Sequence, residues 1–208
     1  LGRFAAGQAR DAFVVSTKVG RLLRPDSQAP ADQHGYVQGL RQAIDVDYSA
    51  DGARRSIEAS LARLGLERVD IVYIHDIDRR THGAAQPARF AEAMDGAYPA
   101  LARLKHEGVV RAIGLGVNEW EVCRDAMAHG DFDAFMLAGR YTLLDRSAAA
   151  ELVPACEARG VRLVVAGAYN SGVLATGAVA GARFDYREAP PEVLARVRRL
   201  EAVCARHG

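Results

Sequence analysis

The sequence has little net charge and no long apolar run. Its 27 lysine and arginine residues nearly balance 26 aspartate and glutamate residues, so the net charge at pH 7 is +1. A chain this close to neutrality gives no electrostatic reason to bind nucleic acid or an anionic membrane. No apolar stretch reaches the length of a membrane-spanning helix. We therefore expect a cytoplasmic protein with a small-molecule substrate and with neither nucleic acid nor membrane as a partner.

Cysteine is also scarce. The three cysteines, Cys123, Cys156 and Cys204, are scattered and do not have the spacing of a metal site. An odd, dispersed set is typical of reduced thiols, and we expect all three to be small buried side chains. The sequence therefore predicts no bound metal.

The rest of the composition is that of an ordinary globular chain. Half of the 208 residues are apolar and a quarter are charged, which predicts a single compact domain over residues 1–208. The chain begins at Leu1 and stops after a helix-like segment with no closing strand. We therefore expect this domain to be incomplete at both ends.

Residues 69–75 are the most informative stretch. They form an apolar, β-branched run that needs cover on both faces, as a strand inside an α/β sheet or barrel receives. The run ends at His75 and is followed by Asp76 and Asp78. Polar residues at the carboxyl end of such a strand are where α/β folds place their chemistry, although capping of the next turn is an alternative role for either carboxylate.

Strand-like and helix-like segments alternate along the whole chain. The expected strands are residues 13–18, 69–75, 112–117, 132–137 and 161–166, and the expected helices are residues 50–64, 89–106, 119–129, 148–159 and a segment opened by Pro190. Residues 21–49 have no clean period, and we expect an irregular loop insertion there, with a short edge strand over residues 43–48.

Strict alternation requires parallel strands with helices packed outside them. An open doubly wound sheet would suit five units, but no Gly-rich phosphate loop follows a strand and opens a helix. Gly114 and Gly116 lie inside their strand. We therefore predict an α/β fold of the (β/α)8 TIM-barrel type, of which this chain carries about five consecutive units.

The polar residues at the strand ends resemble those of the aldo-keto reductase superfamily. They are Lys18, His75, Asn118, Arg140 with Tyr141, and Tyr169 with Asn170 and Ser171. The branch that the chain most resembles contains D-threo-aldose 1-dehydrogenase, L-fucose dehydrogenase and pyridoxal 4-dehydrogenase. The matching stretches are residues 16–20, 56–58, 63–65, 70–76, 108–114, 116–120, 137–144 and 170–174.

The resemblance implies a catalytic set of Asp, Tyr, Lys and His. Lys18 and His75 correspond to the lysine and the histidine; the Asp and Tyr would precede Leu1. Tyr36 and Tyr48 follow Lys18, so we do not assign either of them to the catalytic tyrosine. A lysine ammonium favours the phenolate of a nearby tyrosine, and a histidine can stabilise charge on a substrate oxygen.

The resemblance also implies NADP or NAD as cofactor. The cofactor-binding residues would be Asn118, Tyr169, Asn170, Ser171, Gly172 and Leu174. Asn118 would contact the carboxamide and Tyr169 would stack on the nicotinamide ring, although ordinary turn chemistry is an alternative role for Asn118 and Ser171. Ala138 departs from the glutamine found in many reductases, so Arg140 is a candidate to complete the clamp. We expect Asp76, Trp120 and Arg140 to contact substrate.

The function that these features imply is oxidation of an aldose at C1 to the lactone, with a sugar such as L-fucose, L-galactose or D-arabinose. Pyridoxal 4-dehydrogenase and general carbonyl reductase are alternatives. A catalytically inactive nicotinamide-nucleotide-binding protein is an alternative of another class, and a metal-dependent barrel built on His75, Asp76, Asp78 and His82 is a further one. We expect a monomer or a homodimer.

Overall fold

The computed structural model describes residues 1–33 and 37–207; Tyr36 lies outside the described residues. The chain divides into two compact units, Leu1–Leu115 and Gly116–Gly208, which are described in turn. All five predicted strands are present, in the sheet order β1-β4-β5-β6-β7. Their bounds are β1 (Ser16–Val19), β4 (Val69–His75), β5 (Val110–Val117), β6 (Ala134–Ala138) and β7 (Arg162–Ala166).

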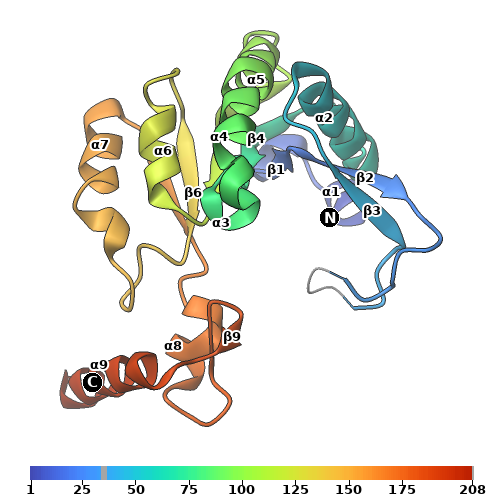
Figure 1. Cartoon of the computed structure of the whole chain (residues 1–208). Helices are drawn as coiled ribbons and strands as arrows, with labels where there is room; N and C mark the ends of the chain where they lie inside the picture. The colour runs from blue at the N-terminus through green and yellow to red at the C-terminus, as the bar shows by residue number, and fades with distance from the viewer. Residues whose placement is uncertain (34–36, 208) are drawn as a thin grey trace. The chain divides into compact units, whose positions relative to one another are not determined.

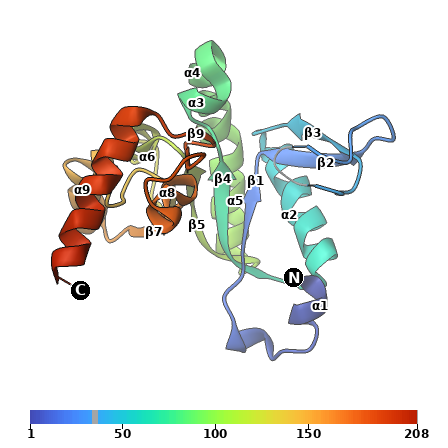
Figure 2. The same cartoon turned by 90° about the horizontal axis from the view of Figure 1, so that it is seen from below.

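In the first unit, β1 and β4 pair in parallel, with Ser16 opposite Ile71 and Val19 opposite Ile74. Val69, Val72 and Ile74 of β4 are almost fully buried. This burial confirms that the apolar run is an interior strand. Because the strands are parallel, the carboxyl ends of β1 and β4 lie within one residue of each other, and Figure 2 shows the two strands side by side.

The helices of the first unit are α1 (Gly2–Ala5), α2 (Ala50–Leu64), α3 (Arg79–His82), α4 (Gln86–Glu92) and α5 (Tyr98–His106). The side chain of Ser49 caps α2 by accepting a hydrogen bond from the Gly52 N–H, and Gly65 ends the helix in a left-handed conformation, as the sequence predicts. A π-helical turn, Ala93–Ala97, joins α4 to α5. Helices α2 and α5 pack against each other (Figure 1).

The prediction of an irregular loop over residues 21–49 is wrong where this stretch forms two strands, although the short edge strand expected over residues 43–48 overlaps the second of them. Strands β2 (Arg21–Pro25) and β3 (Gln42–Val46) form an antiparallel ladder, with Arg21 opposite Val46 and Pro25 opposite Gln42. Neither strand contains a fully buried residue. A hairpin exposed in this way has no fully buried face, so its sequence does not show a clear alternation of apolar and polar residues.

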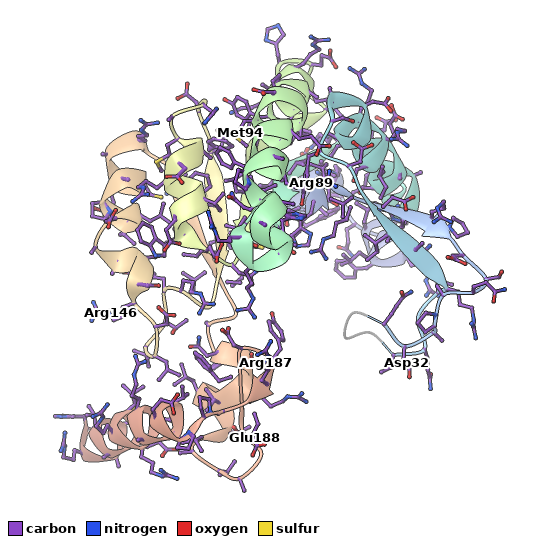
Figure 3. All side chains as sticks on the ribbon, in the orientation of Figure 1. Asp32, Arg89, Met94, Arg146, Arg187 and Glu188 are labelled. Carbon is purple, nitrogen blue, oxygen red and sulfur yellow. The ribbon has the colours of Figure 1, made fainter. Side chains whose placement is uncertain are left out.

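In the second unit, β6 and β7 pair in parallel, with Ala134 opposite Arg162. Its helices are α6 (Trp120–Ala126), α7 (Leu152–Arg159), α8 (Val173–Thr176) and α9 (Pro191–His207). A two-stranded piece, β8 (Arg183–Phe184) with β9 (Arg187–Glu188), was not expected from the sequence. Figure 3 labels Arg187 and Glu188 on it.

Helix α9 buries one face in an apolar cluster. The cluster consists of Leu144, Val173, Ala182, Ala189, Val193 and Val197. Cys123 and Cys156 are buried as predicted, but the prediction is wrong for Cys204, which is exposed near the carboxyl end of α9, beyond the buried residues Val193 and Val197. None of the helices in the described part of the chain combines the length and the apolar character needed to span a bilayer.

A buried carboxylate anchors the amino end of β4. Asp70 is 5% exposed and accepts hydrogen bonds from the Val15 N–H at 2.8 Å and from Arg10 Nη2 at 2.7 Å. Arg111 Nη1 lies 3.4 Å from its other oxygen. Burial alone would raise the pKa of Asp70, but the bonds from Val15 and Arg10 hold the pKa below its ordinary value. The ionised carboxylate therefore ties β1 and β4 to the preceding segment.

Asp70→Asn should lower the free energy of unfolding at pH 7 by about 2–4 kcal/mol, because it leaves Arg10 without its charge partner in a half-buried site. Urea denaturation measures this. The contribution of Asp70 is present above its unfolded pKa of about 3.9 and is lost as the pH falls through the lower folded pKa. The matched control is Asp45→Asn, since Asp45 forms an ion pair that is more than half exposed. Equal losses in the two variants would contradict the anchoring role.

Candidate functional site

Lys18 and His75 stand at the carboxyl ends of adjacent strands in the first unit. Lys18 pairs in register with Tyr73 on β4, and His75 is the last residue of that strand. Both side chains, together with Arg21, line one hollow of about 740 Å³. The strand-end pattern in the sequence therefore brings two of its predicted functional residues to one cavity.

The β2–β3 hairpin forms another wall of this hollow. Leu23 of β2 and both Gln42 and Ile44 of β3 line it. Apolar and amide side chains thus line the same cavity as Lys18 and His75. A wall of this composition can contact both the carbon skeleton and the hydroxyl groups of a small molecule.

The imidazole of His75 is neutral over the physiological range. The pKa of His75 is lowered to about 3. Burial is the main cause, and the positive charges of Arg21 and Lys18 add to its effect. Its side chain is 27% exposed, and Nε2 lies 3.2 Å from Asp76 Oδ2. A neutral imidazole can donate a hydrogen bond to a substrate oxygen without adding a full charge to the site.

Asp76 is already paired. Its carboxylate lies 2.6 Å from Arg21 Nη2, and its side chain is only 13% exposed. Burial raises the pKa of Asp76, against the lowering effect of Arg21. The structure therefore gives Asp76 an internal partner where the sequence suggested a substrate contact. Arg21 was missed, although its position three residues after Lys18 is a signal that could have found it.

Asp78 has the capping role that the sequence left open. Its Oδ1 accepts a hydrogen bond from the Thr81 N–H at 3.0 Å, at the start of α3. Within residues 1–33 and 37–207, no three His, Cys, Asp or Glu side chains are grouped so as to hold a metal ion.

In the second unit, Arg140 contacts Asn118 through the main chain. Arg140 Nε donates to the Asn118 carbonyl oxygen at 3.1 Å, while Nη1 and Nη2 reach Asp145 at 3.1 Å and Asp185 at 3.4 Å. The Arg140 side chain is 19% exposed, and its guanidinium contacts all three of these oxygens. Arg140 thus fixes the loop that carries Asn118, and Asp185 on the β8–β9 turn is a partner that the sequence did not reveal.

Asn170 holds two loops together. It is 5% exposed; Nδ2 donates to the Gly139 carbonyl at 3.1 Å, and Oδ1 accepts from the Thr142 hydroxyl at 2.7 Å. Both ends of its amide are therefore used inside the protein. The hydroxyl of Ser171, the next residue, accepts the Tyr186 N–H at 2.9 Å.

The neighbouring residues leave an open surface. Tyr169 is 65% exposed, and with Tyr141 and Leu174 it lines a hollow of about 960 Å³. Gly172 has φ +102 and open space where a Cβ would lie, so a ligand can approach its backbone closely. An exposed ring beside a bare backbone suits a nicotinamide or ribose group. Trp120 is half-buried, with the Arg124 guanidinium 5.3 Å from its ring centre.

A family model described as "Aldo/keto reductase family" matches residues 1–208. Among curated proteins, the chain is 41% identical over 202 residues to a pyridoxal 4-dehydrogenase of Microbacterium luteolum, covering 92% of this chain and 59% of the relative. It is 39% identical over 214 residues to a D-threo-aldose 1-dehydrogenase of a Pseudomonas species, covering 100% of this chain and 62% of the relative. The chain thus spans about three fifths of the length of these relatives.

Solved structures support the fold. An aldo-keto reductase of Bacillus halodurans in its holo form matches with a TM-score of 0.65 at 24% identity, covering 90% of this chain and 54% of that one. A glycerol dehydrogenase of Gluconobacter oxydans matches with a TM-score of 0.64 at 19% identity, covering 100% of this chain and 59% of that one. The five strands and their helices are therefore part of a (β/α)8 barrel.

The low pKa of His75 predicts a pH dependence of stability. Between pH 6.5 and about 3 the unfolded chain binds a proton on this residue and the folded protein does not, so stability falls as the pH falls, by about 1.4 kcal/mol per pH unit. His75→Gln should remove this part of the slope in urea denaturation between pH 6 and 4. In the unsubstituted protein, the NMR signal of the His75 ring should stay constant down to pH 4; a titration near pH 6.5 would contradict the assignment.

Proposed function

This chain belongs to the aldo/keto reductase family, and from that premise we propose that it is part of an NAD(P)-dependent aldose 1-dehydrogenase. The proposed substrate class is an aldose of the L-fucose, L-galactose or D-arabinose kind, oxidised at C1 to the lactone. The observation that carries the proposal is the pairing of Lys18 and His75 around one hollow at the carboxyl ends of β1 and β4. Similarity over the full chain to a D-threo-aldose 1-dehydrogenase supports the substrate class.

The reaction breaks the C1–H bond and the O–H bond of the ring hemiacetal and forms a C1 carbonyl. The bound nicotinamide nucleotide supplies the acceptor for the hydride. His75, neutral and lining the hollow, donates a hydrogen bond to the substrate oxygen and so positions C1. Lys18 supplies a positive charge that favours the ionised form of a neighbouring acid–base group, through which the hydroxyl proton leaves.

We further propose that the cofactor contacts come from the second unit. Asn118, Tyr169, Ser171, Gly172 and Leu174 are the proposed contacts. Asn170, whose amide is already used by Gly139 and Thr142, supports the loop. By the same reasoning Arg140 holds Asn118 in place and Asp76 holds Arg21, while Trp120 stays a proposed substrate contact.

Pyridoxal oxidation is the second candidate, since a pyridoxal 4-dehydrogenase is 41% identical to this chain. The test is to assay the native full-length protein for reduction of NAD and NADP with L-fucose, L-galactose, D-arabinose and pyridoxal. The proposal predicts the highest kcat/KM with an aldose. Turnover of pyridoxal alone would transfer the function to the second candidate. Saturable nucleotide binding without turnover of any carbonyl or sugar would instead indicate an inactive nucleotide-binding protein.

Lys18→Met should lower kcat by about two to four orders of magnitude, because the acid–base group then loses the charge that tunes it. The Kd for the nucleotide, measured by fluorescence quenching, should change by less than about twofold, since the proposed nucleotide contacts are elsewhere. The matched control is Lys105→Met on α5, the only other lysine of the chain, which should retain full activity. A mild effect of Lys18→Met on kcat would remove Lys18 from the mechanism.

A further inference from the structure

The segment that follows His75 contains a left-handed residue. Asp76 has φ +50, a conformation that residues other than glycine adopt rarely and at an energetic cost. Such a residue persists only where its surroundings fix it, and it lies directly after the proposed catalytic histidine. Some contact must therefore hold this turn.

The hydroxyl of Tyr48 makes that contact. Tyr48 is fully buried, and its hydroxyl lies 2.7 Å from the His75 carbonyl oxygen and 3.2 Å from the Asp76 carbonyl oxygen. These carbonyls belong to the two peptide groups on either side of the Asp76 Cα. One hydroxyl therefore bridges both ends of the left-handed residue.

The orientation of this hydroxyl is fixed by His82. A phenol has one hydrogen to donate, and the shorter distance assigns it to the His75 carbonyl. His82 Nε2, 3.0 Å from the same oxygen, then acts as the donor to Tyr48. The two rings meet edge to face with their centres 5.7 Å apart. His82 lies on α3, so the contact also connects the turn to the next helix.

The ring and the backbone of Tyr48 are also held. Gly20 has φ +104, and a Cβ at that position would lie 2.2 Å from Tyr48 Cε1, so the absence of a side chain at Gly20 makes room for the ring. The Tyr48 N–H donates to Glu92 Oε1 at 3.0 Å. Glu92 is itself held by Arg89 of α4, labelled in Figure 3, at 2.7 Å. Tyr48 is thus packed against the segment that follows Lys18 on β1 and bonded to the segment that carries His75.

We propose that Tyr48 is a positioning residue of the candidate active site, whose hydroxyl holds the left-handed turn at Asp76 and thereby fixes His75. The role rests on the proposed function, in which His75 orients the substrate oxygen. Tyr48 does not take part in proton transfer itself, because its hydroxyl is buried and bonded within the protein. Burial also raises the pKa of Tyr48 far above its ordinary value.

The test is Tyr48→Phe in the native full-length protein, with steady-state kinetics at saturating nucleotide. We expect kcat to fall at least tenfold, because a small displacement of an orienting group costs about that much or more. KM for the nucleotide should stay within twofold. The matched control is Tyr73→Phe, which removes a hydroxyl from a buried tyrosine of β4 and should leave kcat within twofold. A kcat for Tyr48→Phe within twofold of the unsubstituted enzyme would overturn the proposal.

A second measurement separates this proposal from the proposed function. The ring ¹⁵N signals of His75 in histidine-labelled protein report its environment whether or not the protein turns over a substrate. If the unsubstituted protein shows no turnover, the proposed function fails, and these signals alone decide the position of His75. Tyr48→Phe should shift them and Tyr73→Phe should not. Signals that Tyr48→Phe leaves unchanged would show that the hydroxyl does not position His75.

A third comparison guards against loss of folding. Glycine adopts φ +50 without strain, so Asp76→Gly relieves the turn of its need for a clamp. If Tyr48→Phe alone does not fold, the double variant Tyr48→Phe/Asp76→Gly is compared with Asp76→Gly. Because Asp76→Gly removes the strain that the hydroxyl counters, a double variant that folds as Asp76→Gly does supports the proposal. A double variant that stays unfolded under conditions where Asp76→Gly folds overturns it.

Discussion

The burial of β4 on both faces is the constraint on which this structure depends. An interior strand that pairs with β1 on one edge and β5 on the other can carry polar groups only where it enters and leaves the sheet. Strand β4 carries polar groups at both of these ends. Asp70 ties the entrance to Arg10 and to the Val15 N–H, and His75 with Asp76 forms the exit. Stability and proposed chemistry thus occupy opposite ends of one strand.

The long elements could be predicted from the sequence because their signals are local. Helix α2 begins and ends where Ser49 and Gly65 place its caps, and β4 has the predicted bounds because its apolar run stops at a histidine. Only β3 of the β2–β3 hairpin was anticipated, as a short edge strand, because no residue of either strand is fully buried and no period marks β2. The β8–β9 piece is too short for any periodic signal.

The candidate site was predictable only in part. Parallel register places Lys18 opposite Tyr73, two residues before His75, so strand-end reasoning reached both Lys18 and His75. Tyr48 and Asp185 act through tertiary contacts with residues distant in the sequence, and no local pattern marks such contacts. Asn170 shows the converse: its position suggested a ligand contact, but its buried amide is used by Gly139 and Thr142. The sequence pointed to the loop that contains Asn170, and the hydrogen bonds of Asn170 then showed that its amide holds this loop in place.

Transfer of deuterium from the C1 carbon of a labelled aldose to the nicotinamide ring tests the central claim most directly. The account predicts that the native full-length protein forms reduced nucleotide carrying one deuterium per turnover at C4 of that ring, with the lactone as the other product. Deuterium released to water, or oxidation of the sugar without labelled reduced nucleotide, would contradict it.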